Sequence, residues 1–244
     1  MRIVDSHLHL GPCRVFDAEV TASDLVEALE RNEVALALVM PFPGATDAPS
    51  VHDEIARVAR ASGRVAGIVN LNPHCDRGAY AAEAERCVRE LGFVALKLHT
   101  VGHAVDPLTR DGRTVFEEAA RLGVPVMVHT GGVGEPFASP SHCLPLAREF
   151  SETRVVLAHA GMSVSTREAA VVAVECDNVW LETSWCSILD LHSLVGLVGP
   201  GRLMMGSDAL ENLPLAIATY RSLGLRADEL ERCLGGTAAE VFGV

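Results

Sequence analysis

The 244-residue sequence is poor in aromatic residues and in basic side chains, and both shortages argue against nucleic acid as a partner. Phe, Trp and Tyr make up 5% of the residues, and 20 Lys and Arg stand against 32 Asp and Glu, a formal net charge of −12. Base stacking needs aromatic side chains, and a phosphate backbone is attracted by positive charge. We therefore expect a small-molecule partner and no nucleic acid.

Long apolar runs and paired cysteines are also lacking. No stretch of about 18 uninterrupted apolar residues is present, so we expect no membrane span. The seven cysteines are an odd number without a CxxC motif, which indicates free thiols in a reducing compartment. The first residues do not read as a signal peptide, because Asp5, His7 and His9 interrupt their short apolar stretch. These observations predict a cytoplasmic protein.

Three common nucleotide-binding or catalytic motifs are missing as well. The glycine cluster at 131–134 has neither G-x-G-x-x-G nor Walker spacing, and no serine lies in a G-x-S-x-G elbow. No glycine-rich turn follows the first apolar run, which disfavours a doubly wound nucleotide-binding sheet. We interpret the glycine cluster either as a loop that lets the backbone approach a ligand or as a plain turn.

Eight short apolar runs alternate with longer segments of helical periodicity. The predicted strands are 2–10, 34–40, 64–71, 92–99, 124–129, 154–159, 178–183 and 202–207. The predicted helices include 21–32, 50–62, 75–91, 112–122, 162–176, 213–223 and 227–233, followed by a closing turn at 237–242. Thr21 and Ser50 are the predicted N-caps of the first two helices. Strands rich in Val, Ile, Leu, Ala and Met without alternation are typical of a parallel sheet buried on both faces.

This order predicts an α/β fold, a compact (β/α)8 TIM barrel with C-terminal helices. Eight strand–helix units of about 30 residues use nearly the whole chain, which matches the usual size of such a barrel. We therefore expect a single domain over residues 1–244.

Histidines gather at the ends of the predicted strands, where a TIM barrel carries its chemistry. Five of the ten lie there: His7, His9, His99, His129 and His159. His7 and His9 stand two apart on one strand, so their side chains share the interior face. Asp208 follows the last strand and adds a carboxylate. Such a donor set predicts a divalent metal ion, with Zn²⁺ leading and Mn²⁺, Fe²⁺, Co²⁺ or Ni²⁺ tolerated.

Five short motifs follow one another at these strand ends: His7-Leu-His9, Leu96-Lys97-Leu98-His99, Val128-His129-Thr130-Gly131, Ala158-His159-Ala160-Gly161 and Met205-Gly206-Ser207-Asp208-Ala209. Together they resemble the amidohydrolase superfamily, and most closely the amidohydrolase-related branch that also holds metal-dependent decarboxylases. The stretch 199–209 is similar to the strand-eight signature of that branch. The tail 235–243 looks like its C-terminal helix, with Thr237 where Asn is usual.

The resemblance implies a set of metal ligands. His7, His9, His129 and Asp208 match the positions that hold the more buried ion. His159 matches a histidine that acts on the substrate in single-metal members and binds a second ion in two-metal members.

The resemblance implies two alternative roles for Lys97. It matches either a carboxylated lysine that bridges two ions or an ordinary lysine that pairs with a substrate carboxylate or a metal-bound oxyanion. A salt-bridged interior lysine is the structural alternative. We favour one ion over two, and keep His159 and Lys97 as further candidate ligands.

Asp208 and His159 are the candidate catalytic residues. Zn²⁺ lowers the pKa of bound water from 15.7 to about 7, so hydroxide becomes available at neutral pH. Asp208 is expected to take the proton of the water and later deliver it to the leaving group. His159 is expected either to polarise the scissile carbonyl or to hold the anionic intermediate.

Four residues are candidates for substrate binding: Lys97, His99, Glu182 and Trp185. Glu182 has a second reading, in which it orients a ligating histidine through the other ring nitrogen. Trp185 has a second interpretation as a core or interface residue. His99 has a second interpretation as a residue that makes a structural hydrogen bond.

The predicted function is a metal-dependent hydrolase acting on a C–N or ester/lactone bond of a small molecule. A nonoxidative decarboxylase or lyase on the same site is the alternative, and a metal-bearing protein without catalysis is a third. The loop 41–49 has no Arg or Lys to bind a substrate carboxylate, which favours the hydrolase. The resemblance and the apolar composition also lead us to expect a homodimer.

Overall fold

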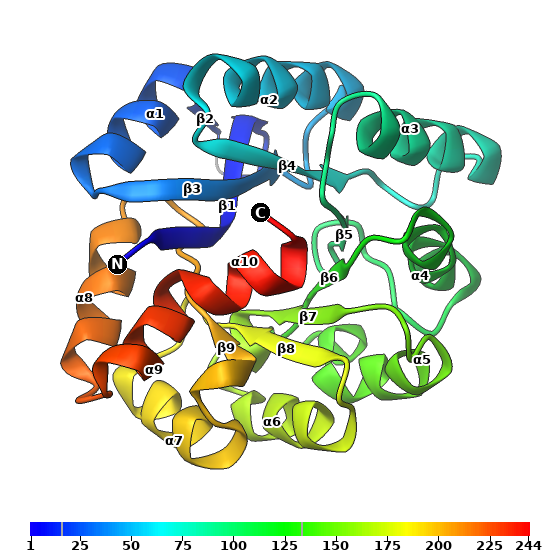
Figure 1. Ribbon diagram of the computed structural model, residues 1–244. Coiled ribbons are helices and arrows are strands. Elements are labelled where there is room, and N and C mark those ends of the chain that lie inside the picture. The colour runs from blue at the N-terminus through cyan, green and yellow to red at the C-terminus, as the bar shows by residue number, and fades with distance from the viewer. Residues whose placement is uncertain (16, 133) are drawn as a thin grey trace.

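Eight parallel strands form a curled sheet that closes into a ring, and helices surround it (Figure 1). The computed structural model describes residues 1–15, 17–132 and 134–244, so Val133 of the glycine cluster lies outside the described residues. The ring strands are β1 (Ile3–Cys13), β3 (Val34–Pro41), β4 (Val65–Asn70), β5 (Ala95–Leu98), β6 (Val126–His129), β7 (Val155–Ala158), β8 (Val179–Glu182) and β9 (Leu203–Met204). The predicted TIM barrel is confirmed.

All the helices of the described chain except the last pack around the outside of the ring of strands (Figure 1). The helices are α1 (Ala22–Arg31), α2 (Ala48–Ser62), α3 (Arg77–Arg89), α4 (Arg110–Leu122), α5 (Leu144–Glu149), α6 (Thr166–Glu175), α7 (Ile188–Val198), α8 (Leu213–Ser222), α9 (Ala227–Glu231) and α10 (Thr237–Phe242). Apolar residues of the strands divide between two cores. One lies between strands and helices, and a smaller one fills the inside of the ring. Within the described chain, no helix has both the length and the apolar character needed to cross a membrane.

Helix α10 closes the amino-terminal end of the ring, where Figure 1 shows it lying across the opening. Its Val241 and Phe242 pack with Val4 and Met127 of the inner core. Arg154, which directly precedes β7, donates to the carbonyl of Val241. Residues 237–242 therefore form the C-terminal helix that the resemblance implied, and not only the closing turn predicted from the sequence pattern, because their apolar side chains seal the inner core.

Two other local predictions need correction. Ser50 is not the N-cap of α2, because Asp47 accepts the Ser50 N–H and the helix begins at Ala48. Thr21 does cap α1, in a capping box with Asp24. A short strand, β2 (Ala18–Val20), was not predicted. It pairs antiparallel with the end of β1.

The ring closes between its first and last strands through few contacts. In the described residues β9 shares no ladder with β1. Instead Ser6 N–H donates to the Met205 carbonyl (3.1 Å) and Asp208 N–H to the His7 carbonyl (2.8 Å). The buried Asp5 carboxyl accepts from Ser207 N (3.1 Å) and from Ser207 Oγ. Burial raises the pKa of Asp5 to about 7, although these hydrogen bonds oppose the shift.

Candidate metal centre

Strand alternation brings polar side chains to the carboxyl end of the ring interior. Ala95 of β5 and Met127 of β6 belong to the inner apolar core. Because strand side chains repeat every two residues, Lys97 and His129 point to the same interior, one level higher. The carboxyl end of the barrel therefore carries a polar layer above an apolar one.

In each of the two histidines of β1, one ring nitrogen is anchored by an oxygen atom and the other faces the site. His7 Nδ1 bonds to Glu182 Oε2 at 2.8 Å, and His9 Nδ1 bonds to the Pro41 carbonyl at 3.1 Å. Carbonyl and carboxylate oxygens only accept hydrogen bonds, so both Nδ1 atoms carry the proton. The Nε2 atoms of His7 and His9 therefore present lone pairs to the site.

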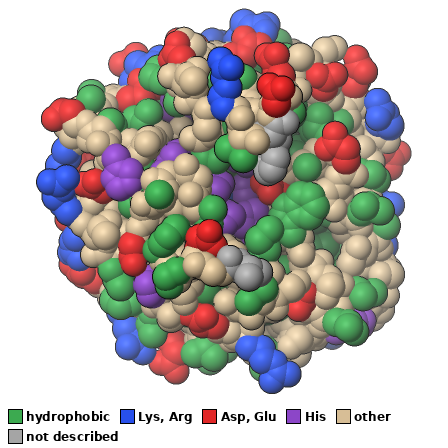
Figure 2. Space-filling view, turned by 180° about the vertical axis from the view of Figure 1, so that it is seen from behind, with side chains coloured by type: hydrophobic (Ala, Val, Ile, Leu, Met, Phe, Trp, Pro, Cys, Tyr) green, Lys and Arg blue, Asp and Glu red, His purple; other side chains and the backbone are tan. Residues whose placement is uncertain are grey.

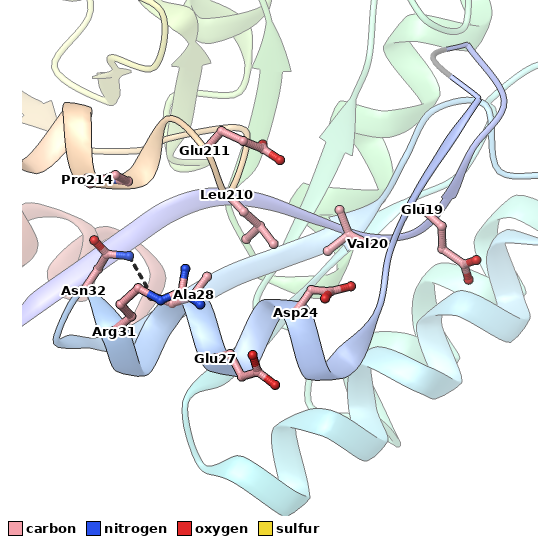
Figure 3. A pocket seen from close by; sticks show the side chains of 10 residues that line it. All are labelled: Glu19, Val20, Asp24, Glu27, Ala28, Arg31, Asn32, Leu210, Glu211 and Pro214. Carbon is pink, nitrogen blue, oxygen red and sulfur yellow. Dashed lines mark hydrogen bonds between the residues drawn. The ribbon is translucent and has the colours of Figure 1, made fainter.

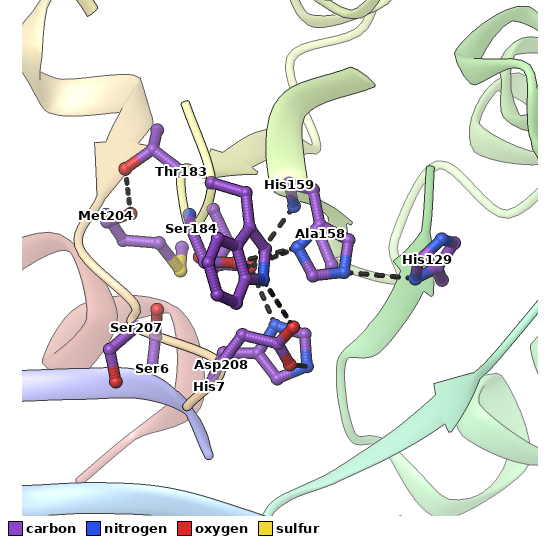
Figure 4. A network of polar contacts seen from close by, with 12 residues as sticks. Ser6, His7, His129, Ala158, His159, Thr183, Ser184, Met204, Ser207 and Asp208 are labelled. Atoms are coloured by element: carbon purple, nitrogen blue, oxygen red, sulfur yellow. Dashed lines mark hydrogen bonds and ion pairs between the residues drawn. The ribbon is translucent and has the colours of Figure 1, made fainter. Parts of the chain in front are cut away.

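His129 is anchored through the opposite nitrogen. Its Nε2 donates to the Gly131 carbonyl at 3.2 Å, which leaves the lone pair on Nδ1. His159 Nε2 lies 3.0 Å from that Nδ1, and His159 Nδ1 bonds to Ser184 Oγ at 2.7 Å. Figure 4 shows His159 between His129 on one side and His7 and Asp208 on the other. His7 and His129 belong to β1 and β6, and His159 and Asp208 follow the ends of β7 and β9.

Asp208 faces the lone pairs of the two β1 histidines. Its Oδ1 lies 3.3 Å from His7 Nε2 and 3.1 Å from His9 Nε2, and the donor atoms of the three residues lie within 4.8 Å of one another. Burial opposes ionisation of Asp208, but His7, His9 and His159 outweigh it and hold its pKa well below the usual range. Two imidazole nitrogens and a carboxylate oxygen that converge in this way are a donor set that fits a divalent metal ion.

Burial favours the neutral form of His7 and His129, which is the form that binds a metal ion. Burial lowers the pKa of His7, and Lys97 adds to the effect. The pKa of His129 lies well below its usual value, because of burial first and then of His159 and Lys97.

Lys97 and Glu182 lie beneath these donors and are fully buried. Lys97 Nζ is 3.3 Å from His7 Nε2, and burial lowers its pKa to about 8 in spite of Asp208 and Glu182. Burial opposes ionisation of Glu182, but His7 and His159 outweigh it and lower its pKa to about 2. Gly206 has no room for a side chain, because a Cβ there would meet Glu182 Oε1 and His7 Cβ. Glu182 thus lies in the position of a group that orients a ligating histidine.

A cavity of about 620 Å³ opens above the metal-ligand candidates. Figure 2 shows this hollow, with histidine side chains at its base. His9, His129, His159 and Asp208 line it, and most of the remaining wall is apolar. Lys97 and Glu182 are not among the described residues of its lining.

His99 and Trp185 both reach this cavity. The His99 ring stacks on His129 with centroids 4.4 Å apart. Gly102 N–H donates to His99 Nδ1, so the proton of a neutral His99 ring lies on Nε2. Trp185 is 45% exposed and donates from Nε1 to Asp208 Oδ2 at 2.6 Å, so it is not a core residue.

Sequence reasoning missed several partners of these side chains. Asp5 ties Ser207 to β1, and Ser184 bonds to His159. The pattern Asp5-x-His7-x-His9 places a carboxyl beside the histidine pair and could have signalled Asp5. The Pro41 and Gly131 carbonyls leave no signal, because a backbone group does not depend on residue type.

A TIM barrel with converging imidazoles and a carboxylate at its carboxyl end defines a metal-dependent class of enzyme. The family model for amidohydrolases matches residues 4–244. The chain therefore belongs to the amidohydrolase family, as the sequence motifs predicted.

Solved structures share the fold over the whole chain at low sequence identity. A putative amidohydrolase from Staphylococcus aureus is 14% identical with a TM-score of 0.79, and the match covers 100% of both chains. A dihydroxybenzoic acid decarboxylase from Polaromonas sp. JS666, with bound manganese and the inhibitor 2-nitroresorcinol, is 16% identical with a TM-score of 0.77, covering 99% of this chain and 97% of the other. A probable 2-pyrone-4,6-dicarboxylic acid hydrolase from Acinetobacter baumannii is 15% identical with a TM-score of 0.71, covering 100% of both. No curated protein sequence matches the chain.

Proposed function

We propose that the chain is a metal-dependent hydrolase that uses a metal-activated water on a C–N or ester/lactone bond of a small molecule. The observation that best supports this is the pair of anchored imidazoles, His7 and His9, whose Nε2 lone pairs face Asp208 Oδ1, with the anchored ring of His129 at the same end of the barrel. A divalent ion, when bound there, lowers the pKa of water and supplies a nucleophile near neutral pH.

The side chains around that ion have separate roles in this proposal. Asp208 accepts the proton of the attacking water and returns it to the leaving group. His159 polarises the scissile carbonyl from the cavity base. His99 Nε2–H and Trp185 contact the substrate along the wall. Lys97 and Glu182 act from below, on His7 rather than on the substrate.

Zinc is the proposed ion, with His7, His9, His129 and Asp208 as its ligands and one ion per chain. Metal analysis of the purified protein tests this proposal. Manganese is the alternative result, because the same donors tolerate Mn²⁺ and a decarboxylase of the same fold holds it. Two ions per chain, together with a carboxylated Lys97 in the mass of the native protein, would contradict the single-ion proposal.

Charge at the cavity favours a substrate without a carboxylate. The charged side chains in its described lining, Glu19, Asp208 and Glu211, are all acidic. A neighbouring groove shares Glu19 and Glu211 with the cavity and adds Asp24 and Glu27, against a single Arg31 (Figure 3). These carboxylates repel an anion that approaches the mouth. The proposed substrate is therefore a neutral or cationic ester, lactone or amide.

A decarboxylase on the same site is the second candidate, supported by relatives of the same fold such as the dihydroxybenzoic acid decarboxylase. Turnover in ¹⁸O-labelled water separates the two. A hydrolase places one labelled oxygen in its product, whereas CO₂ release without net water addition would overturn the hydrolase proposal. A panel of neutral lactones, esters and amides beside aromatic carboxylates, with the metal-stripped enzyme as blank, completes the test.

We also propose a homodimer and a cytoplasmic location. Exposed apolar side chains on α6, α7 and α8, among them Val171, Leu189 and Leu215, support the first. The seven free cysteines support the second. Light scattering on the purified chain tests the dimer, and a monomer at micromolar concentration would contradict it.

A further inference from the structure

The turn between β8 and α7 contacts the candidate metal centre through three successive side chains. Ser184 Oγ bonds to His159 Nδ1, and Cys186 Sγ lies 3.3 Å from the His159 carbonyl. Between them, Trp185 reaches across to Asp208. Trp185 is therefore the member of this turn that touches the carboxylate.

Trp185 gives the two oxygens of Asp208 different partners. Oδ1 faces the Nε2 lone pairs of His7 and His9, while Oδ2 accepts the indole N–H at 2.6 Å. An indole nitrogen donates and cannot accept, so it pairs only with a carboxylate lone pair. While that bond holds, one lone pair of Oδ2 is used, the other can still accept a proton from water, and Oδ1 is turned to the imidazoles.

The backbone at both residues supports a positional role. Trp185 has φ 63° and Asp208 has φ 64°, in the left-handed region that favours glycine. Non-glycine residues persist there only when their surroundings fix them, and such positions cluster at functional sites. Two strained residues here meet through one hydrogen bond.

Packing alone does not hold the indole in place. The Trp185 side chain is 45% exposed, and it separates the cavity from a second hollow of about 230 Å³ between α7 and α8. Leu215 and Tyr220 line that hollow. Open space on two sides leaves the bond to Asp208 as the main restraint on the ring.

We propose that Trp185 is a positioning residue that holds Asp208 Oδ2, so that the carboxylate presents Oδ1 alone to the metal ion. The inference rests on the proposed metal centre. It gives Trp185 a role in metal binding, whatever bond the enzyme cleaves.

The test is metal affinity, measured with Co²⁺ against a competing chelator. Trp185→Phe keeps the aromatic ring and removes the N–H, and Trp185→Leu removes both. A hydrogen bond to a metal-binding side chain typically changes metal affinity by about 10–100-fold. We therefore expect the affinity of both variants for Co²⁺ to fall by about tenfold or more. Trp180→Phe is the matched control and should bind like the wild type, because Trp180 packs against Arg202 away from the donors.

A ring that served only as a wall would behave differently: Trp185→Phe would bind Co²⁺ like the wild type, and that result would overturn the inference. Thermal unfolding of the metal-free variants checks that each is folded. Failure of the wild type itself to bind Co²⁺ would instead contradict the proposed metal centre. The two failures are therefore distinguishable.

Discussion

At the scale of single residues, the chemistry depends on which atoms of the site can still accept a proton. Asp208 is ionised, close to three histidines and at the cavity surface. Asp208→Asn keeps the size and removes the basicity, so we expect a folded protein whose turnover falls by about 10²–10⁴-fold. Steady-state kinetics on the true substrate, at matched metal content, measure this loss. Activity near that of the wild type would mean that the base has been assigned wrongly.

Glu182 offers a second test at this scale. Its carboxylate receives donors only: His7 Nδ1–H, the His159 N–H and the Ser184 N–H and hydroxyl. Glu182→Gln turns an NH₂ group toward those donors, so His7 loses its orientation. We expect metal affinity to fall by about 10–100-fold, measured by chelator competition. Unchanged affinity would show that His7 is oriented by packing alone.

At the scale of elements, a second cluster of possible ligands, His52, Glu83 and Cys87, joins helices rather than holding an ion. His52 Nδ1 donates to Glu83 at 2.8 Å, and His52 Nε2 accepts from Asn70 N–H at 3.2 Å. Both ring nitrogens are used, so no lone pair is left for a metal. The cluster ties α2 to α3 and to the end of β4.

This tie predicts a pH-dependent contribution to stability. Burial opposes ionisation of Glu83, but hydrogen bonds from His52 and Arg86 outweigh it and lower its pKa from 4.5 to about 2. Since the folded pKa is the lower one, the contribution is complete above 4.5 and is lost as the pH falls toward 2. Glu83→Gln should cost about 1–2 kcal/mol at neutral pH and progressively less in acid, measured by urea unfolding.

The exposed pair of Glu54 and Arg57 on α2 supplies the control. Glu54→Gln should change the free energy of unfolding by less than about 0.5 kcal/mol. A pH-independent cost for Glu83→Gln would show that its shape, and not its charge, matters.

The elements also show what a sequence can and cannot predict. Buried strands such as β3 and β7 are continuous apolar runs, so period and composition locate them within a residue or two. The sequence does not predict β2, because two of its three residues are exposed and its pairing with β1 produces no apolar pattern. Only Leu203–Met204 of the predicted 202–207 strand pairs with β8, because Met205 donates to the Cys233 carbonyl instead.

The same distinction holds inside the site. Motifs and spacing predicted which histidines meet, because strand ends converge in any barrel. They could not predict the anchors of His9 and His129, which are backbone carbonyls, or the bond from Trp185 to Asp208, which depends on a left-handed turn. Residue types indicate which side chains are candidate ligands, whereas the tautomers of the histidines and the restraints on them depend on tertiary geometry.

At the scale of the whole molecule, the ring has a weak seam between its first and last strands, and the proposed ion spans it. His7 and His9 lie on one side and Asp208 on the other. In the described chain the two sides share two backbone hydrogen bonds, a bond from the Ser6 hydroxyl to the Met205 carbonyl and the contacts of Asp5, but no ladder of paired strands. An ion that binds only the folded chain adds stability by mass action. At about 100 times its dissociation constant that is about 2.7 kcal/mol, or about 5–10 °C in unfolding temperature for a chain of this length.

Thermal unfolding with and without Zn²⁺ measures the shift, with His129→Ala as a control that lacks one ligand. Hydrogen exchange then shows which part of the fold the ion stabilises. The added protection should concentrate in β1 and in residues 203–208. The protection of α3 and α4, which lie away from the seam, should change least. The seam has few backbone hydrogen bonds of its own, so the ion is expected to add stability where the hydrogen bonds of the sheet add least. An equal gain of protection around the ring, or a stabilisation that His129→Ala retains in full, would show that the ion does not close the barrel.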